Sequence, residues 1–199
     1  MNVADLLHLR SLDGRKGATF TRDGHHRLRL ERVLSLATKP LGFIGLNPSI
    51  ATHEVDDPTI RREVGFAERE GCGGIIAGNL SPFRATDPDK LYRMVGKMAT
   101  MGDLLLAFPP GHTALLIEAM RPCETVIAGW GNFAGASRAA RTVLMFQARE
   151  LTLAFEAAGI PLYCLGFTAD GWPRHPLYLP ADAPLRRWTP PALPLPVPR

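Results

Sequence analysis

The chain has 199 residues, of which 46% are hydrophobic, and it carries a formal net charge of +4 at pH 7. This length fits one domain with a substantial core, and no apolar stretch reaches the ~20 residues of a membrane-spanning helix. The N-terminus places Asp5, His8 and Arg10 among its apolar residues, which argues against the apolar core of a signal peptide. We therefore expect a soluble, cytoplasmic protein.

The three cysteines, Cys72, Cys123 and Cys164, are widely spaced and lack a C-x-x-C pair. Neither a disulfide framework nor a zinc site is indicated, and we expect buried structural thiols instead. The sequence thus predicts no metal and no other cofactor.

The positive charge is concentrated near the start of the chain. Residues 1–40 hold eight Lys or Arg side chains against four acids, an excess equal to that of the whole chain. Such a segment suits a nucleic-acid backbone, although basic segments are also common as solvated surface. We regard it as a basic N-terminal extension of a single domain that spans residues 1–188.

The first predicted elements precede a buried strand. Residues 1–12 predict a short amphipathic helix, and Asp-Gly pairs at 13–14 and 23–24 are turn signals. Residues 27–34 alternate charged and apolar side chains, as an edge strand with one face in water would. Residues 41–46 are continuously apolar and predict the first fully buried strand.

Helices and strands alternate after that point. Asp57 followed by Pro58 predicts the start of a helix that runs to about Glu70. The remaining expected elements are strands at 74–78, 125–128 and 161–166, and helices around 89–92, at 112–120 and at 135–158. This order predicts an α/β fold, a three-layer sandwich with a central, mainly parallel four-stranded sheet. The proline-rich tail, residues 189–199, is expected to be poorly ordered or laid across the surface.

Polar turns follow the predicted strands. They are Gly-Leu-Asn-Pro-Ser at 45–49, Gly-Asn at 78–79, Gly-Trp-Gly-Asn at 129–132 and, in a late loop, His-Pro at 175–176. Because open α/β sheets bind ligands at the carboxyl ends of their strands, we expect these turns to form one site.

In this order the motifs resemble the uracil-DNA glycosylase superfamily. There a first strand ends in Gly-x-Asp/Asn-Pro, a second carries an Asn that reads the base, a third ends in a segment such as Trp-Gly-Ser-Tyr, and a late loop begins His-Pro. The resemblance covers roughly residues 41–180. The tract from Phe43 to Pro180 is also similar to an uncharacterised domain family, DUF1643, through its GLNPS, DDPTIRR, NLxxxRATDP and RHPLYLP landmarks.

The superfamily resemblance implies a fold and a reaction. It implies a monofunctional, monomeric DNA glycosylase that flips out a damaged or modified pyrimidine and hydrolyses its glycosidic bond. Asn47 would position the attacking water, Asn79 would pair with the polar edge of the base, and His175 would donate to its O2. An amide cannot take a proton at neutral pH, so hydrolysis should be slower than with an aspartate. No lysine occurs in the motifs, which argues against a lyase route.

Several further residues are candidates for contacts with the base or the DNA. Ser49 stands where uracil-specific relatives have a tyrosine, and its small side chain leaves room for a substituent at the 5-position of the base. A hypermodified phage base is therefore an alternative substrate to uracil, and anti-phage defence is an alternative role to repair. Phe83 and Phe66 are candidates for stacking on the base, or else core residues. The substrate-binding set is completed by Gly45, Leu46 and Pro48, and the DNA-binding set is Arg61, Arg62, Arg84, Arg174, Leu177 and Tyr178.

Simpler interpretations stay open. Asn47 is also a common turn former before a proline, and His175 could be an ordinary loop histidine. The pair Asp56-Asp57 could cap a helix or supply a carboxylate that supplements Asn47. Trp130 is expected to support the site rather than to react. Two other functions fit the same motifs, namely a nucleic-acid-binding module without turnover and a nucleoside or nucleotide hydrolase.

Overall fold

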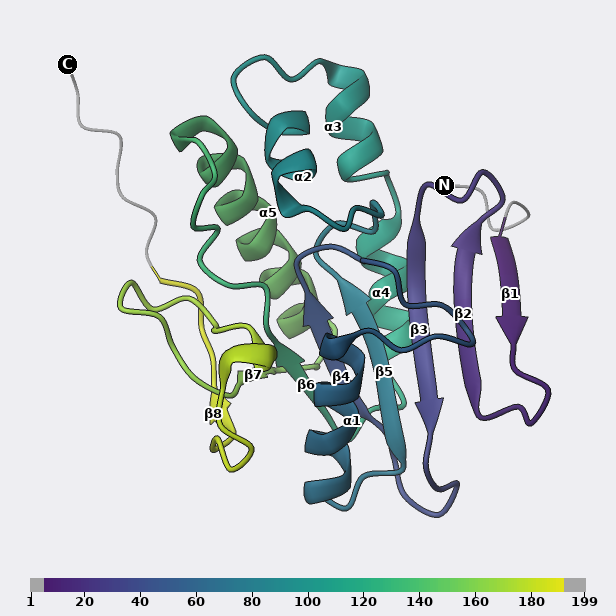
Figure 1. Ribbon diagram of the computed structural model, residues 1–199. Helices are drawn as coiled ribbons and strands as arrows, with labels where there is room; N and C mark the ends of the chain where they lie inside the picture. The colour runs from purple at the N-terminus through teal and green to yellow at the C-terminus, as the bar shows by residue number, and fades with distance from the viewer. Residues whose placement is uncertain (1–5, 192–199) are drawn as a thin grey trace.

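The computed structural model describes residues 6–191 and shows a mixed α/β fold built on a single eight-stranded sheet (Figure 1). The strand order is β1-β2-β3-β5-β4-β6-β7-β8. The strands are β1 (Leu6–Arg10), β2 (Lys16–Thr21), β3 (Arg27–Val33), β4 (Leu41–Gly45), β5 (Gly74–Asn79), β6 (Thr125–Ala128), β7 (Leu162–Cys164) and β8 (Arg186–Arg187). The helices are α1 (Pro58–Arg69), α2 (Pro88–Met94), α3 (Met101–Ala107), α4 (His112–Met120) and α5 (Arg138–Ala157), with a 3-10 turn at Pro176–Tyr178.

The predicted α/β class is confirmed, but the sheet is larger than the four strands expected. Four of its seven strand pairings are antiparallel and three are parallel. The parallel pairings join β5, β4, β6 and β7, and antiparallel strands extend the sheet at both edges. Within residues 6–191, no helix is long and apolar enough to cross a membrane.

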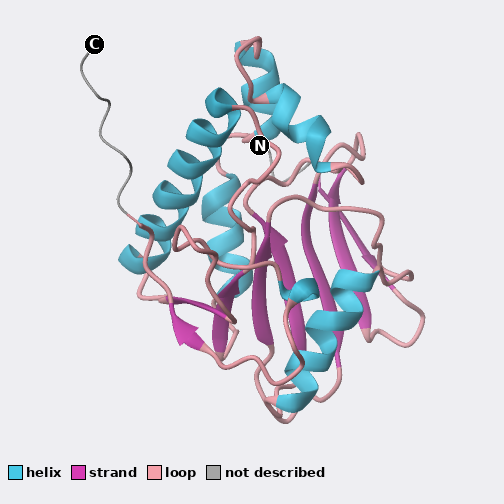
Figure 2. Ribbon diagram, turned by 60° about the vertical axis from the view of Figure 1, so that its left-hand side comes forward, coloured by secondary structure: helices cyan, strands magenta, loops and turns pink. Residues whose placement is uncertain are grey.

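Two hydrophobic clusters lie on opposite faces of the sheet, because successive side chains of a strand point to opposite sides. On one face Phe43 and Ile75 pack with Ile60 and Phe66 of α1. On the other face the neighbouring strand residue Ile44 belongs to a cluster with α4 and α5. Figure 2 shows α1 on one side of the sheet, with α4 and α5 covering the other.

The prediction of a helix over residues 1–12 is wrong for its described part. Residues 6–10 form β1, which pairs antiparallel with β2 through a turn at Asp13 and Gly14. Gly14 has a φ of +69°, a backbone conformation that glycine adopts without strain. The expectation of an edge strand at residues 27–34 is also wrong, because β3 pairs with β2 on one side and with β5 on the other. Its alternating pattern is nevertheless visible in its burial.

The connections place β4 in the middle of the parallel strands. The chain leaves β4, forms α1 and returns as β5 on one side, and then crosses to β6 on the other side. The strand order therefore reverses direction at the carboxyl end of β4, which is where open α/β sheets bind ligands. The expected proline-rich tail falls mostly on residues 192–199, outside the described residues.

Candidate functional site

A pocket of about 360 Å³ lies at the carboxyl ends of β4 and β5. Residues from all four predicted turns line it, together with side chains that the sequence did not single out. The sequence-predicted residues in its wall are Gly45, Leu46, Asn47, Ser49, Asp57, Asn79, Trp130, His175, Leu177 and Tyr178. Segments that lie far apart in the sequence thus meet at one edge of the sheet.

Asn47 is held by the backbone around it. Its Nδ2 donates to the carbonyl of Ala85 at 2.7 Å and to that of Pro48 at 3.2 Å. The turn itself is bound to the chain that follows β5, because Leu80 N donates to Gly45 O and Ala85 N donates to Pro48 O. Neither side-chain bond uses Oδ1, so the acceptor oxygen of Asn47 is the atom that can bind a water or a substrate donor.

Asn79 ends β5 and is fixed from three directions. Arg27 approaches its Oδ1, with Nη2 at 3.5 Å, and His112 Nε2 lies 2.8 Å from its main-chain oxygen. Burial lowers the pKa of His112 to about 4, so this imidazole is neutral and donates to that oxygen. Gly45 leaves room for the amide, because a Cβ there would stand 2.8 Å from Asn79 Nδ2. The Nδ2 group is thereby left as the donor at the pocket wall.

His175 caps the turn at Pro176–Tyr178. Its Nδ1 accepts from the main-chain nitrogen of Leu177 at 3.2 Å, which requires an unprotonated Nδ1. Burial lowers the pKa of His175, with the carboxyl group of Asp57 opposing that shift. The side chain is therefore a neutral imidazole at pH 7 that carries its proton on Nε2, and it can donate into the pocket that it lines.

The Gly-Trp-Gly-Asn turn supports the His-Pro loop. A Cβ at Gly129 would stand 2.6 Å from the Pro176 ring, and Gly131 N donates to Pro173 O. Trp130 is 2% exposed and packs edge-on against Trp188, with ring centroids 5.2 Å apart. Its Nε1 has no hydrogen-bond partner among the described residues. The indole thus combines a structural contact with a spare donor at the pocket wall.

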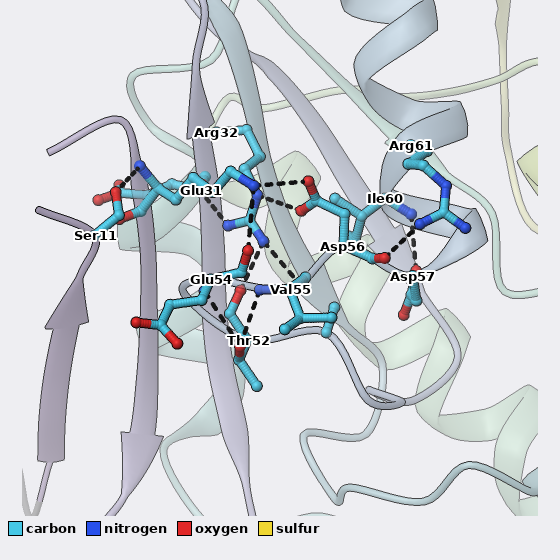
Figure 3. A network of polar contacts seen from close by, with 12 residues as sticks. Ser11, Glu31, Arg32, Thr52, Glu54, Val55, Asp56, Asp57, Ile60 and Arg61 are labelled. Carbon is cyan, nitrogen blue, oxygen red and sulfur yellow. Dashed lines mark hydrogen bonds and ion pairs between the residues drawn. The ribbon is translucent and has the colours of Figure 1, made fainter. Parts of the chain in front are cut away.

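The two acids before α1 have different positions. Asp57 Oδ1 accepts from Ile60 N at 2.9 Å, which confirms the helix cap, and the same residue lines the pocket. Asp56 points the other way (Figure 3) and accepts from Arg32 at 2.6 Å and from Lys16 at 3.1 Å. Burial disfavours its charge, but these two cations hold the pKa of Asp56 below its ordinary value. Asp56 therefore joins the N-terminal strands to the loop before α1 and is absent from the pocket wall.

An arginine and a glutamic acid in the pocket wall were missed by the sequence reasoning. Arg27, the first residue of β3, is buried and donates to Ala51 O at 3.0 Å. Burial lowers its pKa to about 10, so its guanidinium stays charged at neutral pH. Glu63 is 4% exposed, and burial raises its pKa to about 8. An acid on the buried stripe of α1, three residues after Ile60, is the signal that could have identified it.

The aromatic candidates for stacking lie elsewhere. Phe83 is 3% exposed, outside the pocket wall, and contacts His26 edge-on, and Phe66 belongs to the core under α1. Tyr92, on α2, is the half-buried aromatic ring that does line the pocket. Burial, followed by the charge of Asp89, raises its pKa, so its hydroxyl is neutral and can both donate and accept.

The predicted DNA-binding arginines are held by main-chain oxygens. Arg62 donates to Leu179 O and Arg174 donates to Tyr178 O. Arg61 and Arg84 make similar bonds, to Asp56 O and Gly24 O. Leu177 and the largely exposed Tyr178 lie at the pocket instead.

A second groove of about 490 Å³ adjoins the pocket and shares Ser49, Ala85 and Thr86 with it. Its wall includes the cations Arg84, Lys90 and Arg93 and the acid Asp87. By contrast, most cations of the first forty residues are already engaged with acids or buried, namely Arg10, Lys16, Arg27, Arg29, Arg32 and Lys39.

Residues 6–191 contain no group of three or more His, Cys, Asp or Glu side chains that could hold a metal ion. No curated protein and no solved structure matches the chain. The family model described as "Protein of unknown function (DUF1643)" matches residues 27–177, which run from the start of β3 to the turn that carries His175. The match covers more than half of the chain, which therefore belongs to the DUF1643 family.

Proposed function

We propose that this protein is a monofunctional DNA glycosylase related to the uracil-DNA glycosylase superfamily. One observation carries the proposal: Asn47, Asn79, Trp130 and His175, which come from the four turns that resemble that superfamily, line one pocket. The finer fold assignment belongs to the same proposal. The parallel strands β5, β4, β6 and β7, with helices on both faces, would be the central layer of a glycosylase-like sandwich.

The chemistry of glycosidic cleavage fits these groups. Water attacks C1′ of the sugar while the C1′–N bond breaks, the bonding electrons leave with the base, and the proton that the water loses ends on the nitrogen of the released base. The departing base becomes negatively charged, so neutral donors near its oxygens stabilise the transition state, each by roughly 3 kcal/mol. His175 Nε2 and Asn79 Nδ2 are donors of this type. Asn47 Oδ1 is an acceptor that can orient the attacking water, although it cannot remove its proton.

The basic groove supports a polymeric substrate. Lys90 and Arg93 line a groove that continues from the pocket, so a phosphodiester backbone could lie there while the base occupies the pocket. The small side chain of Ser49 stands where groove and pocket meet, which leaves room for a substituent on the base. The proposed substrates are therefore uracil or a 5-substituted pyrimidine in DNA, in base-excision repair or in anti-phage defence.

The first experiment is mass-spectrometric detection of free bases released by the pure protein. The DNA panel contains uracil, 5-hydroxymethylated pyrimidines and glucosylated phage DNA. Asn47→Ala and His175→Ala should abolish most of the release and leave duplex binding nearly unchanged. Asn132→Ala is the matched control, because Asn132 bonds to Asp170 and stands outside the pocket wall. No release from any of these DNAs by the wild-type protein would refute the proposal.

A second candidate function is nucleic-acid binding without turnover. It is favoured by Asn47, because an amide cannot act as the general base that activates water, and its Nδ2 already donates to Ala85 O. Tight, salt-dependent DNA binding by a protein that releases no base would support this alternative. Cleavage of free nucleosides with no salt-dependent DNA binding would instead favour a nucleoside hydrolase.

A further inference from the structure

Glu63 is a buried acid in the wall of the pocket. It stands on the inner face of α1, is 4% exposed, and its Oε2 has no hydrogen-bond partner among residues 6–191. Within residues 6–191, Glu63 forms no ion pair, since no pair of a Lys, Arg or His nitrogen with a carboxylate oxygen within 4 Å includes it. A polar side-chain atom that is buried without a protein partner calls for an explanation, such as a bound water or a role in binding or catalysis, and Glu63 lines the pocket.

Burial favours the neutral form of Glu63 and outweighs the charges around it. Arg27, from β3, attracts a carboxylate at this position, but the carboxyl group of Asp57, from the cap of α1, repels one. Burial outweighs the attraction and raises the pKa of Glu63 to about 8. Three other titratable groups share the pocket wall, His175, Tyr92 and Tyr178. At pH 7 Glu63 is therefore a carboxylic acid, with one O–H donor.

We propose that Glu63 is a substrate-binding residue that donates a hydrogen bond from its protonated carboxyl group to a carbonyl or ring-nitrogen acceptor of the heterocycle in the pocket. This inference rests on the proposed function and adds a recognition residue to it. Its physical basis is that a buried, unpartnered acid lines the same pocket as the Asn79 amide and the His175 imidazole. Three neutral donors then surround one acceptor-bearing ring.

Ionisation of Glu63 would act against the reaction in two ways. It removes the donor, and it places a negative charge beside a base that is itself becoming negative. Base release should therefore decrease about tenfold per pH unit above the pKa of Glu63. Neither His175 nor Tyr92 produces this decrease below pH 9.5, because the pKa of His175 is lowered from 6.5 and that of Tyr92 is raised from 10. Arg27, with a pKa of about 10, stays charged over the same range.

The test measures single-turnover base release from uracil-containing duplex and from the other DNAs of the panel, between pH 6.5 and 9.5. Glu63→Gln keeps a donor at every pH, so its rate should stay level where the wild-type rate falls. Glu63→Ala should lose at least tenfold at pH 7. Glu68→Gln, on the exposed side of the same helix, is the matched control and should follow the wild type. Equal alkaline profiles for wild type and Glu63→Gln would overturn the proposal.

A second measurement separates failure of this inference from failure of the proposed function. Carboxyl ¹³C NMR of glutamate-labelled protein follows the ionisation of Glu63 directly, with Glu63→Gln identifying its resonance. A carboxyl group that is ionised at pH 7 refutes the donor role, whatever the substrate is. A neutral group together with no base release would support the donor and refute the glycosylase. Base release that Glu63→Ala leaves unchanged would refute the donor role and support the glycosylase.

Discussion

The buried acid Glu63 should make the protein less stable as the pH rises, and Glu63→Gln should remove that dependence. The unfolded chain releases the proton near pH 4.5, whereas the folded chain keeps it until about pH 8. Between these values the folded state binds more protons, so the free energy of unfolding decreases with pH by about 1.4 kcal/mol per unit. From pH 4.5 to pH 7 the loss is about 3 kcal/mol, and it levels off above the folded pKa.

Urea unfolding of wild type and Glu63→Gln at intervals from pH 4.5 to 8.5 measures this difference. At pH 4.5 the folded Glu63 is neutral and the unfolded one is about half ionised, so the difference measured there comes mainly from exchanging OH for NH₂. The variant should then gain about 3 kcal/mol over the wild type by pH 7, or about 6–12 °C in Tm for a chain of this size. Glu68→Gln, which is exposed, should show no such trend. A difference that is constant with pH would refute the assignment of Glu63 as a neutral buried acid.

Three other perturbations probe the site and its support. Gly45→Ala should lower base release about 100-fold with little effect on DNA affinity, because the added Cβ would stand 2.8 Å from Asn79 Nδ2 and push the amide out of place. Single-turnover kinetics measures the loss. Lys90→Gln with Arg93→Gln should reduce the slope of log affinity against log salt by about two, in fluorescence-anisotropy titrations, and an unchanged slope would remove the groove from the DNA path. Asp56→Asn should cost about 3 kcal/mol of stability at pH 7, because it leaves the buried Arg32 without its carboxylate partner. The difference from wild type should shrink as the pH falls below 3.8 towards the lowered folded pKa of Asp56, and denaturation at pH 7 and pH 3 tests both statements.

The strand and helix order was predictable because each central element is long enough to show its period. Residues 125–128 and 112–120 match β6 and α4 at both ends, and Asp57 caps α1 as its position before Pro58 predicts. What failed were elements whose stability comes from a partner elsewhere in the chain. The last three residues of β1 are exposed, and its sequence alone predicts a helix. Only its pairing with β2 makes it a strand. α3 was missed although Thr100 forms a capping box with Asp103, a signal present in the sequence.

The candidate site was predictable to the extent that its residues follow parallel strands. Asn47 and Asn79 come after neighbouring strands that run in the same direction, so their meeting at one edge follows from topology alone. Arg27 could not be found in this way, because it begins a strand rather than ending one. β3 runs antiparallel to β5, so its first residue lies beside the end of β5 and its side chain reaches Asn79. The extra antiparallel strands thus enlarge the sheet and also supply the buried cation that fixes Asn79, while Glu63 enters the same pocket from the helix above it.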